Sequence, residues 1–279
     1  MISQVKLVFS YCLISSLFIM YLEAAPVSKN ERFGTAFITS VAGNSINFKN
    51  STTTHSIRLH DSIILNSDTL IRTGDRDYVF FKLSNNTTFG ILESTQFSIQ
   101  SFQQDTFTDK DVRFDREPSI SNFKSTLDEG TIVVKSNIIS PLSIFEIHLP
   151  DSKLELYSAI AVISYRYNIL HIALYEGNIS LKSNNSIKHI NAPSYYVIDS
   201  YNLKNSIDNY DADLSEAPSQ WNLLKDSISV ENNRVIFTPE ERSSQSAAKA
   251  KLISIKDFYN QNFIRPRSFQ KLEFKDSKD

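Results

Sequence analysis

Side chains that could bind a metal or catalyse a reaction are scattered along this sequence. The histidines form neither a His-x-His nor a His-Glu-x-x-His pattern, which are spacings typical of zinc sites. No Gly-x-Ser-x-Gly elbow and no phosphate-binding glycine pattern occurs either. We therefore expect structural histidines, no metal, no cofactor, no catalytic residue and no enzyme activity. The histidines concerned are His55, His60, His148, His171 and His189.

Acidic residues offer one candidate for calcium. Asp211-x-Asp213 is flanked by Asn209 and Glu216, and oxygen-rich loops can bind Ca²⁺. An EF-hand loop needs a third ligand and a glycine at defined positions, and both are missing here. The sequence therefore favours a solvated acidic linker. The run Asp75–Asp77, beside a glycine, is interpreted in the same way as an ordinary turn.

Two tyrosine-rich runs could stack on a glycan. Tyr165-Arg166-Tyr167 and Tyr195-Tyr196 both lie in expected strands, where alternate tyrosines more often pack within a sheet. A pair of carboxylates for glycoside hydrolysis could still assemble in space. The sequence singles out no such pair, so a carbohydrate-active enzyme remains the third hypothesis.

Charge and cysteine content narrow the class of protein. Lys and Arg number 29 against 31 Asp and Glu, so the net charge is −2. A nucleic-acid-binding protein would carry a basic excess, and we expect no nucleic acid partner. Cys12 is the one cysteine, and it lies in the expected leader. The mature chain would then have no disulfide and no thiolate metal site, which fits a bacterial envelope protein.

The first 24 residues have the features of a secretory signal peptide. Lys6 precedes an apolar run over residues 7–22, and small residues follow at Ala24 and Ala25, the expected cleavage site. The alternative is an uncleaved anchor, although a spanning helix needs about 20 apolar residues and this run is shorter. We expect a periplasmic or extracellular protein with no stable membrane span after cleavage.

From Phe33 onward, short apolar segments alternate with polar turns, which is the pattern of strands and hairpins. A tight turn is expected at Glu176-Gly177-Asn178, and a long loop or protruding hairpin over Gln100–Ser125. We predict an all-β fold. The expected strands are Tyr78–Leu83, Thr87–Ile91, Phe97–Ile99, Thr131–Val134, Ile144–His148, Leu154–Tyr157, Ala161–Tyr165, Leu170–Tyr175, Ile179–Lys182 and Ser194–Ile198.

The chain also contains an internal echo. Leu83-x5-Phe89-x-Ile91-x5-Phe97 resembles Leu149-x4-Leu154-x-Leu156-x5-Val162. Two similar β units in succession predict paired sheets that pack their apolar faces together, as in an antiparallel β-sandwich or β-roll.

The C-terminal part differs in character. We expect a short helix over Ala217–Asp226, with Pro218 near its first turn, and a strand over Arg234–Phe237. A second helix is expected over Glu240–Lys256 and a poorly ordered tail over Arg265–Asp279. The expected organisation is thus a signal peptide (1–24), a β domain (34–200) and a C-terminal extension (201–279).

Five segments together resemble the FecR domain family. The first ends in Asp-Thr-Leu-Ile-Arg-Thr-Gly and is followed by a strand, a polar turn and a second strand, as in that family. Two departures occur, at Ser158-Ala159 and Ala192-Pro193-Ser194, where the family usually has glycine. The resemblance covers about residues 34–200. Its segments are Asp61–Gly74, Ser94–Ile99, Leu127–Val134, Phe145–Pro150 and Leu174–Leu181.

The resemblance implies a role in binding. FecR proteins are regulators whose periplasmic part receives a signal and whose cytoplasmic anti-sigma segment passes it on. Only five residues precede Lys6, so we expect a free-standing exported relative. The first hypothesis is a non-enzymatic module that docks an envelope protein or a cell-wall glycan. The second is a signalling component that regulates a sigma factor through a partner.

Overall fold

The computed structural model describes residues 31–43, 46–49, 54–66, 68–183, 186–199, 211–240 and 245–253. Arg32–Asp279 form one compact unit, which holds all of these residues except Glu31. The expected signal peptide, with Ala24 and Ala25, and the expected tail over 265–279 lie outside the described residues. No helix in the described part is both long and apolar enough to cross a membrane.

Strands dominate the described residues, which confirms the all-β prediction. The described residues of the C-terminal part form one α-helix and one short 3-10 helix. The elements are β1 (Glu31–Phe33), β2 (Thr35–Ala42), β3 (Asn47–Lys49), β4 (Thr54–Ser56), β5 (Ser62–Ile64), β6 (Thr69–Arg72), β7 (Tyr78–Leu83), β8 (Thr88–Ile91), β9 (Gln96–Asp105), β10 (Ser121–Ser136), β11 (Ile144–Leu149), β12 (Ser152–Arg166), β13 (Ile169–Lys182), β14 (Ile187–Asn191), β15 (Ser194–Asp199), β16 (Asp211–Ala212), η1 (Leu214–Glu216), α3 (Gln220–Asn232), β17 (Val235–Pro239) and β18 (Ala248–Leu252).

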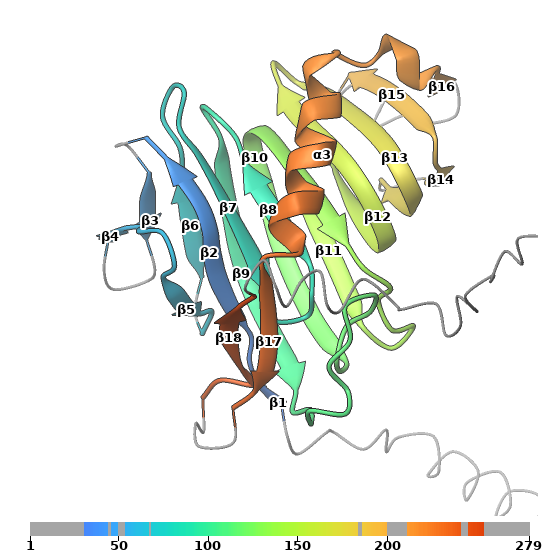
Figure 1. Ribbon diagram of the computed structural model, residues 1–279. Helices are drawn as coiled ribbons and strands as arrows, with labels where there is room; N and C mark the ends of the chain where they lie inside the picture. Colours follow the sequence, from blue (N-terminus) through green and yellow to red (C-terminus); the bar gives the residue numbers. More distant parts are fainter. Residues whose placement is uncertain are drawn as a thin grey trace, which may run out of the picture. The chain divides into compact units, whose positions relative to one another are not determined.

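The described residues place 16 strands in one continuous sheet that folds over on itself (Figure 1). Three long strands, β10, β12 and β13, run through both layers. The first part of β10 pairs with β9 and β11, and its second part pairs with β8 and β12. The first layer therefore contains β5, β2, β7, β8, β15 and β16, and the second contains β4, β3, β6, β9, β11 and β14. All these pairs are antiparallel except that of β10 with β11.

Phenylalanine side chains fill the space between the two layers. The ring of Phe89, on β8 of the first layer, lies 5.5 Å from that of Phe123 and 6.0 Å from that of Phe145, both in the second layer. Phe97, on β9, approaches the same ring at 5.3 Å. In a strand, alternate residues point to opposite faces, so the period-two pattern sends these rings inward. The predicted sandwich or roll is thus confirmed.

The two segments of the internal echo both form hairpins. Leu83 ends β7, which pairs with β8 in the first layer. Leu149 ends β11, which pairs with the first part of β12 in the second layer. The two similar units therefore contribute one hairpin to each layer of the roll.

The C-terminal extension covers the outer face of the first layer. In Figure 1, α3 lies across β8, β10 and β12, and it contacts each of them. Trp221 and Ile228 from α3 pack against Val133, Val162 and Tyr195 of the sheet. The hairpin of β17 and β18 buries its own apolar side chains against Phe37 and Phe107. The expected strand over Arg234–Phe237 corresponds to β17.

Two local predictions were wrong. The segment 176–178 is no turn, because β13 runs on from Ile169 to Lys182 with Gly177 in the left-handed region at φ +80°. The chain reverses instead at Tyr167-Asn168, where both φ values are positive, at 52° and 61°, as a two-residue hairpin turn requires. Part of the expected second helix is strand β18, since pairing with β17 overrides the helix propensity of its alanines and lysines.

Of the two alternatives expected over Gln100–Ser125, the hairpin is the one observed, because β9 continues to Asp105 and pairs antiparallel with β10, which begins at Ser121. The remaining segment, 106–120, is attached to the β7–β8 turn by hydrogen bonds. Asn86 Nδ2 donates hydrogen bonds to the carbonyls of Arg113 (2.7 Å) and Arg116 (2.8 Å), and Phe107 is buried. The segment is therefore fixed to the roll.

Candidate functional site: a groove beside helix α3

A groove of about 820 Å³ opens between the first turn of α3 and one end of the sheet. Two turns of the chain form one wall: the β6–β7 turn at residues 74–77 and the β8–β9 turn at residues 92–95. The start of α3 forms the other wall. The lining residues are Asp75, Arg76, Asp77, Tyr78, Leu92, Glu93, Ser94, Thr131, Arg166, Pro218, Gln220, Trp221, Leu223 and Leu224.

Hydrogen bonds within the two turns hold the polar wall in place. Ser94 Oγ donates to Asp75 Oδ1 at 2.6 Å, and the Arg76 amide donates to Glu93 Oε2 at 3.2 Å. The Gly74 amide donates to Asp77 Oδ2 at 3.1 Å. Each carboxylate of the groove therefore serves as an acceptor that shapes a turn.

The backbone of this wall is unusual at two positions. Arg76 has φ 64° and Ser94 has φ 50°, in the left-handed region that side chains other than glycine rarely occupy. Such residues persist where the surroundings over-determine them, and they concentrate at binding sites. The turn hydrogen bonds supply that constraint here, so Arg76 is presented at the groove by a backbone that is fixed.

Two guanidinium groups lie in the groove without a carboxylate partner. Arg166 Nη2 donates to the backbone carbonyl of Glu93 at 2.7 Å. Among the described residues, no ion pair joins Arg76 or Arg166 to an acidic side chain. A guanidinium carries five N–H donors. Most of the donor capacity of this pair therefore faces solvent.

The opposite wall is apolar and comes from α3. Leu223 is 68 % exposed, whereas Trp221 is only 7 % exposed. The Trp221 ring lies edge-on to Tyr195 at 6.1 Å and to His171 at 6.3 Å. These contacts fix the first turn of the helix on the sheet, so the exposed Leu223 side chain is held at the rim.

The aromatic contacts beneath α3 explain one predicted histidine. His171 Nδ1 and the Tyr195 hydroxyl are hydrogen-bonded at 2.9 Å, and burial lowers the pKa of the imidazole. Burial, together with the nearby Glu216, raises the pKa of Tyr195. Both groups are thus kept neutral beneath the helix. This is a packing role for His171, as expected.

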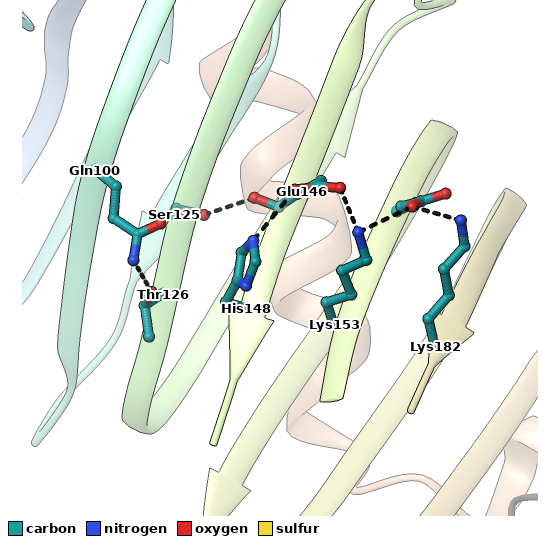
Figure 2. A network of polar contacts seen from close by, with 8 residues as sticks. Gln100, Ser125, Thr126, Glu146, His148, Lys153 and Lys182 are labelled. Carbon is teal, nitrogen blue, oxygen red and sulfur yellow. Dashed lines mark hydrogen bonds and ion pairs between the residues drawn. The ribbon is translucent and has the colours of Figure 1, made fainter. Parts of the chain in front are cut away.

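A second polar cluster occupies the outer face of the second layer (Figure 2). Glu146 accepts a hydrogen bond from Lys153 Nζ at 2.6 Å and lies 3.2 Å from His148 Nε2. Glu155 forms ion pairs with Lys153 at 3.4 Å and with Lys182 at 2.6 Å. The register places Glu146 opposite Glu155 and Lys153 opposite Lys182, so the ion pairs run diagonally between strands or along one strand.

Burial acts to raise the pKa of Glu146, but the hydrogen bonds and charges of Lys153 and His148 outweigh it and lower that pKa. The carboxylate is therefore kept ionised by its neighbours. A network in which each charge has a partner stabilises a sheet surface. It leaves little unused hydrogen-bonding capacity for a ligand, so this face is a weaker candidate than the groove.

Glu117 is a carboxyl group whose pKa burial raises, although hydrogen bonds from Ser143, Ser140 and Ser121 act to lower it. The Ser140 amide donates to Oε1 at 2.7 Å and the Ser121 hydroxyl to Oε2 at 3.0 Å. Glu117 thus ties segment 106–120 to the β10–β11 connection. This position, away from the groove, indicates a structural role.

The remaining predicted site residues do not converge. Tyr195 and Tyr196 are buried. Of the two tyrosines in Tyr165-Arg166-Tyr167, Tyr165 is buried and Tyr167 is exposed. Asp213 caps η1 by accepting from the Ser215 amide at 2.9 Å. Within the described residues, no three His, Cys, Asp or Glu side chains are grouped so as to hold a metal ion.

Sequence reasoning missed the groove, although it noted the run Asp75–Asp77 and Arg166. It interpreted Asp75–Asp77 as an ordinary turn. These residues do form a turn, and they also line the groove. The signal that was available is an arginine between two aspartates at a turn. This turn becomes part of a site only when five segments that are separate in sequence are folded together.

Comparisons with known proteins do not assign a family. No protein-family model matches the chain, and no curated protein matches it. Two crystal structures described as a candidate anti-sigma factor from Parabacteroides distasonis align with it at TM-scores of 0.38 and 0.36. The sequence identities are 10 % and 9 %, over 67 % and 66 % of this chain and 100 % and 99 % of the other chains.

Proposed function

We propose that this protein is an exported, non-enzymatic binding module of a bacterial envelope, and that it docks a partner protein in the groove beside α3. The observation that carries the proposal is the make-up of the groove. One wall offers Arg76 and Arg166 without carboxylate partners among the described residues, and the other offers the exposed Leu223. Arginine and aromatic residues beside an apolar anchor are typical of the centres of protein interfaces.

A protein partner fits the groove better than a glycan does. Sugar rings stack on open aromatic faces, but Trp221 is almost covered and Tyr195 and Tyr196 are buried. Tyr78, at 37 % exposed, is the partly open aromatic side chain of the lining, and Leu223, at 68 %, is the more exposed one. An aliphatic side chain of a partner would cover Leu223.

The arrangement of the carboxylates supports a non-enzymatic role. A hydrolase with two catalytic carboxylates needs side chains that are free to donate or accept a proton at the substrate. Asp75, Asp77 and Glu93 each accept a hydrogen bond that holds a turn of the wall. We therefore place the carbohydrate-active enzyme last among the hypotheses.

Export and signalling belong to the proposal as well. The apolar run over residues 7–22 and the small residues at Ala24 and Ala25 support an exported protein. Signalling through a partner in the manner of sigma-factor regulation is the alternative that the FecR resemblance favours. A membrane-bound regulator as the docked protein would support that alternative.

The test is chemical crosslinking of the chain to solubilised envelope proteins, followed by identification of the partner and recombinant reconstitution. The Leu223→Lys variant should lose the partner, because a charge replaces the apolar anchor. Val230→Lys is the matched control, since Val230 is also exposed and on α3 but outside the groove. If both variants retain the partner equally, the groove is not the docking site. Binding to purified peptidoglycan in place of any protein would overturn the choice of a protein partner.

A further inference from the structure

We infer that the groove recognises an acidic segment of its partner, in which an apolar side chain lies beside one or more carboxylates. This inference rests on the proposed function and adds the chemistry of the bound segment. Five parts of the chain contribute: the turns at 74–77 and 92–95, Thr131 of β10, the end of β12 at Arg166, and the start of α3.

The acidic preference follows from the unused donors. Arg76 and Arg166 have no ion-pair partner in the part of the chain that the structure describes, and Arg166 spends one N–H group on the Glu93 carbonyl. A planar guanidinium binds a carboxylate through two parallel hydrogen bonds, which are charge-assisted and therefore among the stronger ones. A partner carboxylate is the group that would use these donors.

The lining also contains three carboxylates, Asp75, Asp77 and Glu93. Asp75 and Glu93 accept hydrogen bonds from Ser94 and from the Arg76 amide, and Arg76 and Ser94 have left-handed backbone conformations. A carboxylate has about four acceptor sites, so these bonds do not exclude a lysine of a partner. The lysine-flanked peptide in the experiment below decides between the two charge preferences.

The apolar element follows from Leu223 and its neighbours. Leu223 is largely exposed, and Pro218, Leu224 and Leu92 extend the same lining. An aliphatic or aromatic side chain of the partner would remove this surface from water, which is favourable in proportion to the apolar area covered. The groove volume of about 820 Å³ is within the range that holds a compact ligand, so a short segment is sufficient.

The experiment uses short capped peptides and the fluorescence of Trp221, the one tryptophan of the chain and a member of the lining. Three peptides of equal length are titrated: leucine flanked by aspartates, leucine flanked by lysines, and serine flanked by aspartates. We expect the first to bind more tightly than the others, and its binding to weaken as salt is added. Tighter binding of the lysine peptide would overturn the inference.

Variants of the full chain assign the effect to the groove. Arg76→Ala and Arg166→Ala should each weaken binding of the acidic peptide by about two- to fivefold, and Leu223→Ser by about tenfold. Arg113→Ala, an exposed arginine on segment 106–120, is the control and should bind as the parent does. Unchanged binding in both groove arginine variants would overturn the acidic preference.

Failure of this inference can be told from failure of the proposed function. If a reconstituted protein partner needs Leu223 but neither Arg76 nor Arg166, docking in the groove stands and the acidic preference is wrong. If neither the partner nor any peptide responds to the three groove variants, both are wrong. Binding of a soluble peptidoglycan fragment that is lost in Arg166→Ala would also overturn a peptide ligand.

Discussion

Lys82 Nζ donates a hydrogen bond of 2.7 Å to the backbone carbonyl of Asn232, the last residue of α3, across 150 positions of sequence. A second bond of 2.9 Å goes to the carbonyl of Val235, where β17 begins. The side chain is only 1 % exposed. Thr88 Oγ1 adds a bond of 2.8 Å to Asn232 Oδ1. The strands β7 and β8 thus hold the junction of α3 and β17, and with it the helix that walls the groove.

This buried ammonium makes stability depend on pH. Burial, helped by the nearby Lys135, lowers the pKa of Lys82 from 10.5 to about 7. Between these two values the unfolded chain binds the proton and the folded chain does not, so the free energy of unfolding rises with pH in that window. Lys82→Met should lose this rise. Urea unfolding at pH 7 and at pH 9 measures it, with the exposed Lys251→Met as control. A parallel rise in Lys82→Met and the parent would contradict the assignment.

Glu117 should stabilise the connection between segment 106–120 and β10–β11 through its three hydrogen bonds. Glu117→Ala leaves buried donors without an acceptor and should lower the free energy of unfolding by about 1–3 kcal/mol. Glu117→Gln keeps an acceptor and should cost less. Chemical denaturation of the two variants side by side measures the difference, and equal losses would show that the hydrogen bonds contribute little.

The raised pKa of Glu117 predicts an opposite pH trend to that of Lys82. Above the ordinary carboxyl value and below the raised one, the folded chain binds the proton and the unfolded chain does not. The contribution of Glu117 is therefore fully present below the ordinary value and declines as pH rises through the raised value. Glu117→Gln should not show this decline. An identical decline in parent and variant would assign it to other groups.

Glu146→Gln should weaken the charged network of the second layer. The lowered pKa means that the carboxylate stabilises the fold above its ordinary pKa, and that this contribution is lost as pH falls through the lowered value. We expect a loss of about 1 kcal/mol near neutral pH, which vanishes in acid. Thermal unfolding at both pH values measures it, with the exposed Glu129→Gln as control. A loss that persists in acid would contradict the electrostatic explanation.

Gly177→Ala should be strongly destabilising. Gly177 has φ +80°, and an added Cβ would lie 1.6 Å from the carbonyl oxygen of Ser158. Because a backbone atom of the neighbouring strand must move, the loss should be about 3 kcal/mol. The matched control is Asn178→Ala, next in sequence and exposed, which should fold like the parent. Measured free energies of unfolding that agree for both variants would show that the bend accommodates a side chain.

The same glycine shows where local patterns mislead. Glu176-Gly177-Asn178 carries good turn residues between two apolar runs, and we expected a hairpin there. The strand instead continues through a bend, because Gly177 allows a close approach to β12 that lets β13 pass from one layer to the other. The run Tyr167-Asn168 forms the turn although neither residue is a glycine. Turn-forming residues indicate that the backbone can bend at a position. Whether the chain reverses there or continues as a strand depends on the strand with which it pairs.

The C-terminal hairpin gives a second example. Ala247, Ala248 and Ala250 favour a helix by propensity, yet Ala248–Leu252 pair with Val235–Pro239. Burial of Ala248 and Phe237 together with Phe37 of the sheet outweighs a preference that amounts to tenths of a kcal/mol per residue. The helix expected over Ala217–Asp226 from the position of Pro218 is present as α3, which begins at Gln220 and continues to Asn232.

By itself, the sequence determined that the fold is all-β and placed most of its strands, because side chains in a strand alternate between two faces and so leave a period of two in the residue order. It also showed that a disulfide within the chain is impossible, because Cys12 is the one cysteine. Only the tertiary structure decided that Lys82 reaches Asn232 and that Arg76, Arg166 and Leu223 line one groove. Such relationships depend on which strands pair and in what register, and contacts between distant segments leave no period in the sequence.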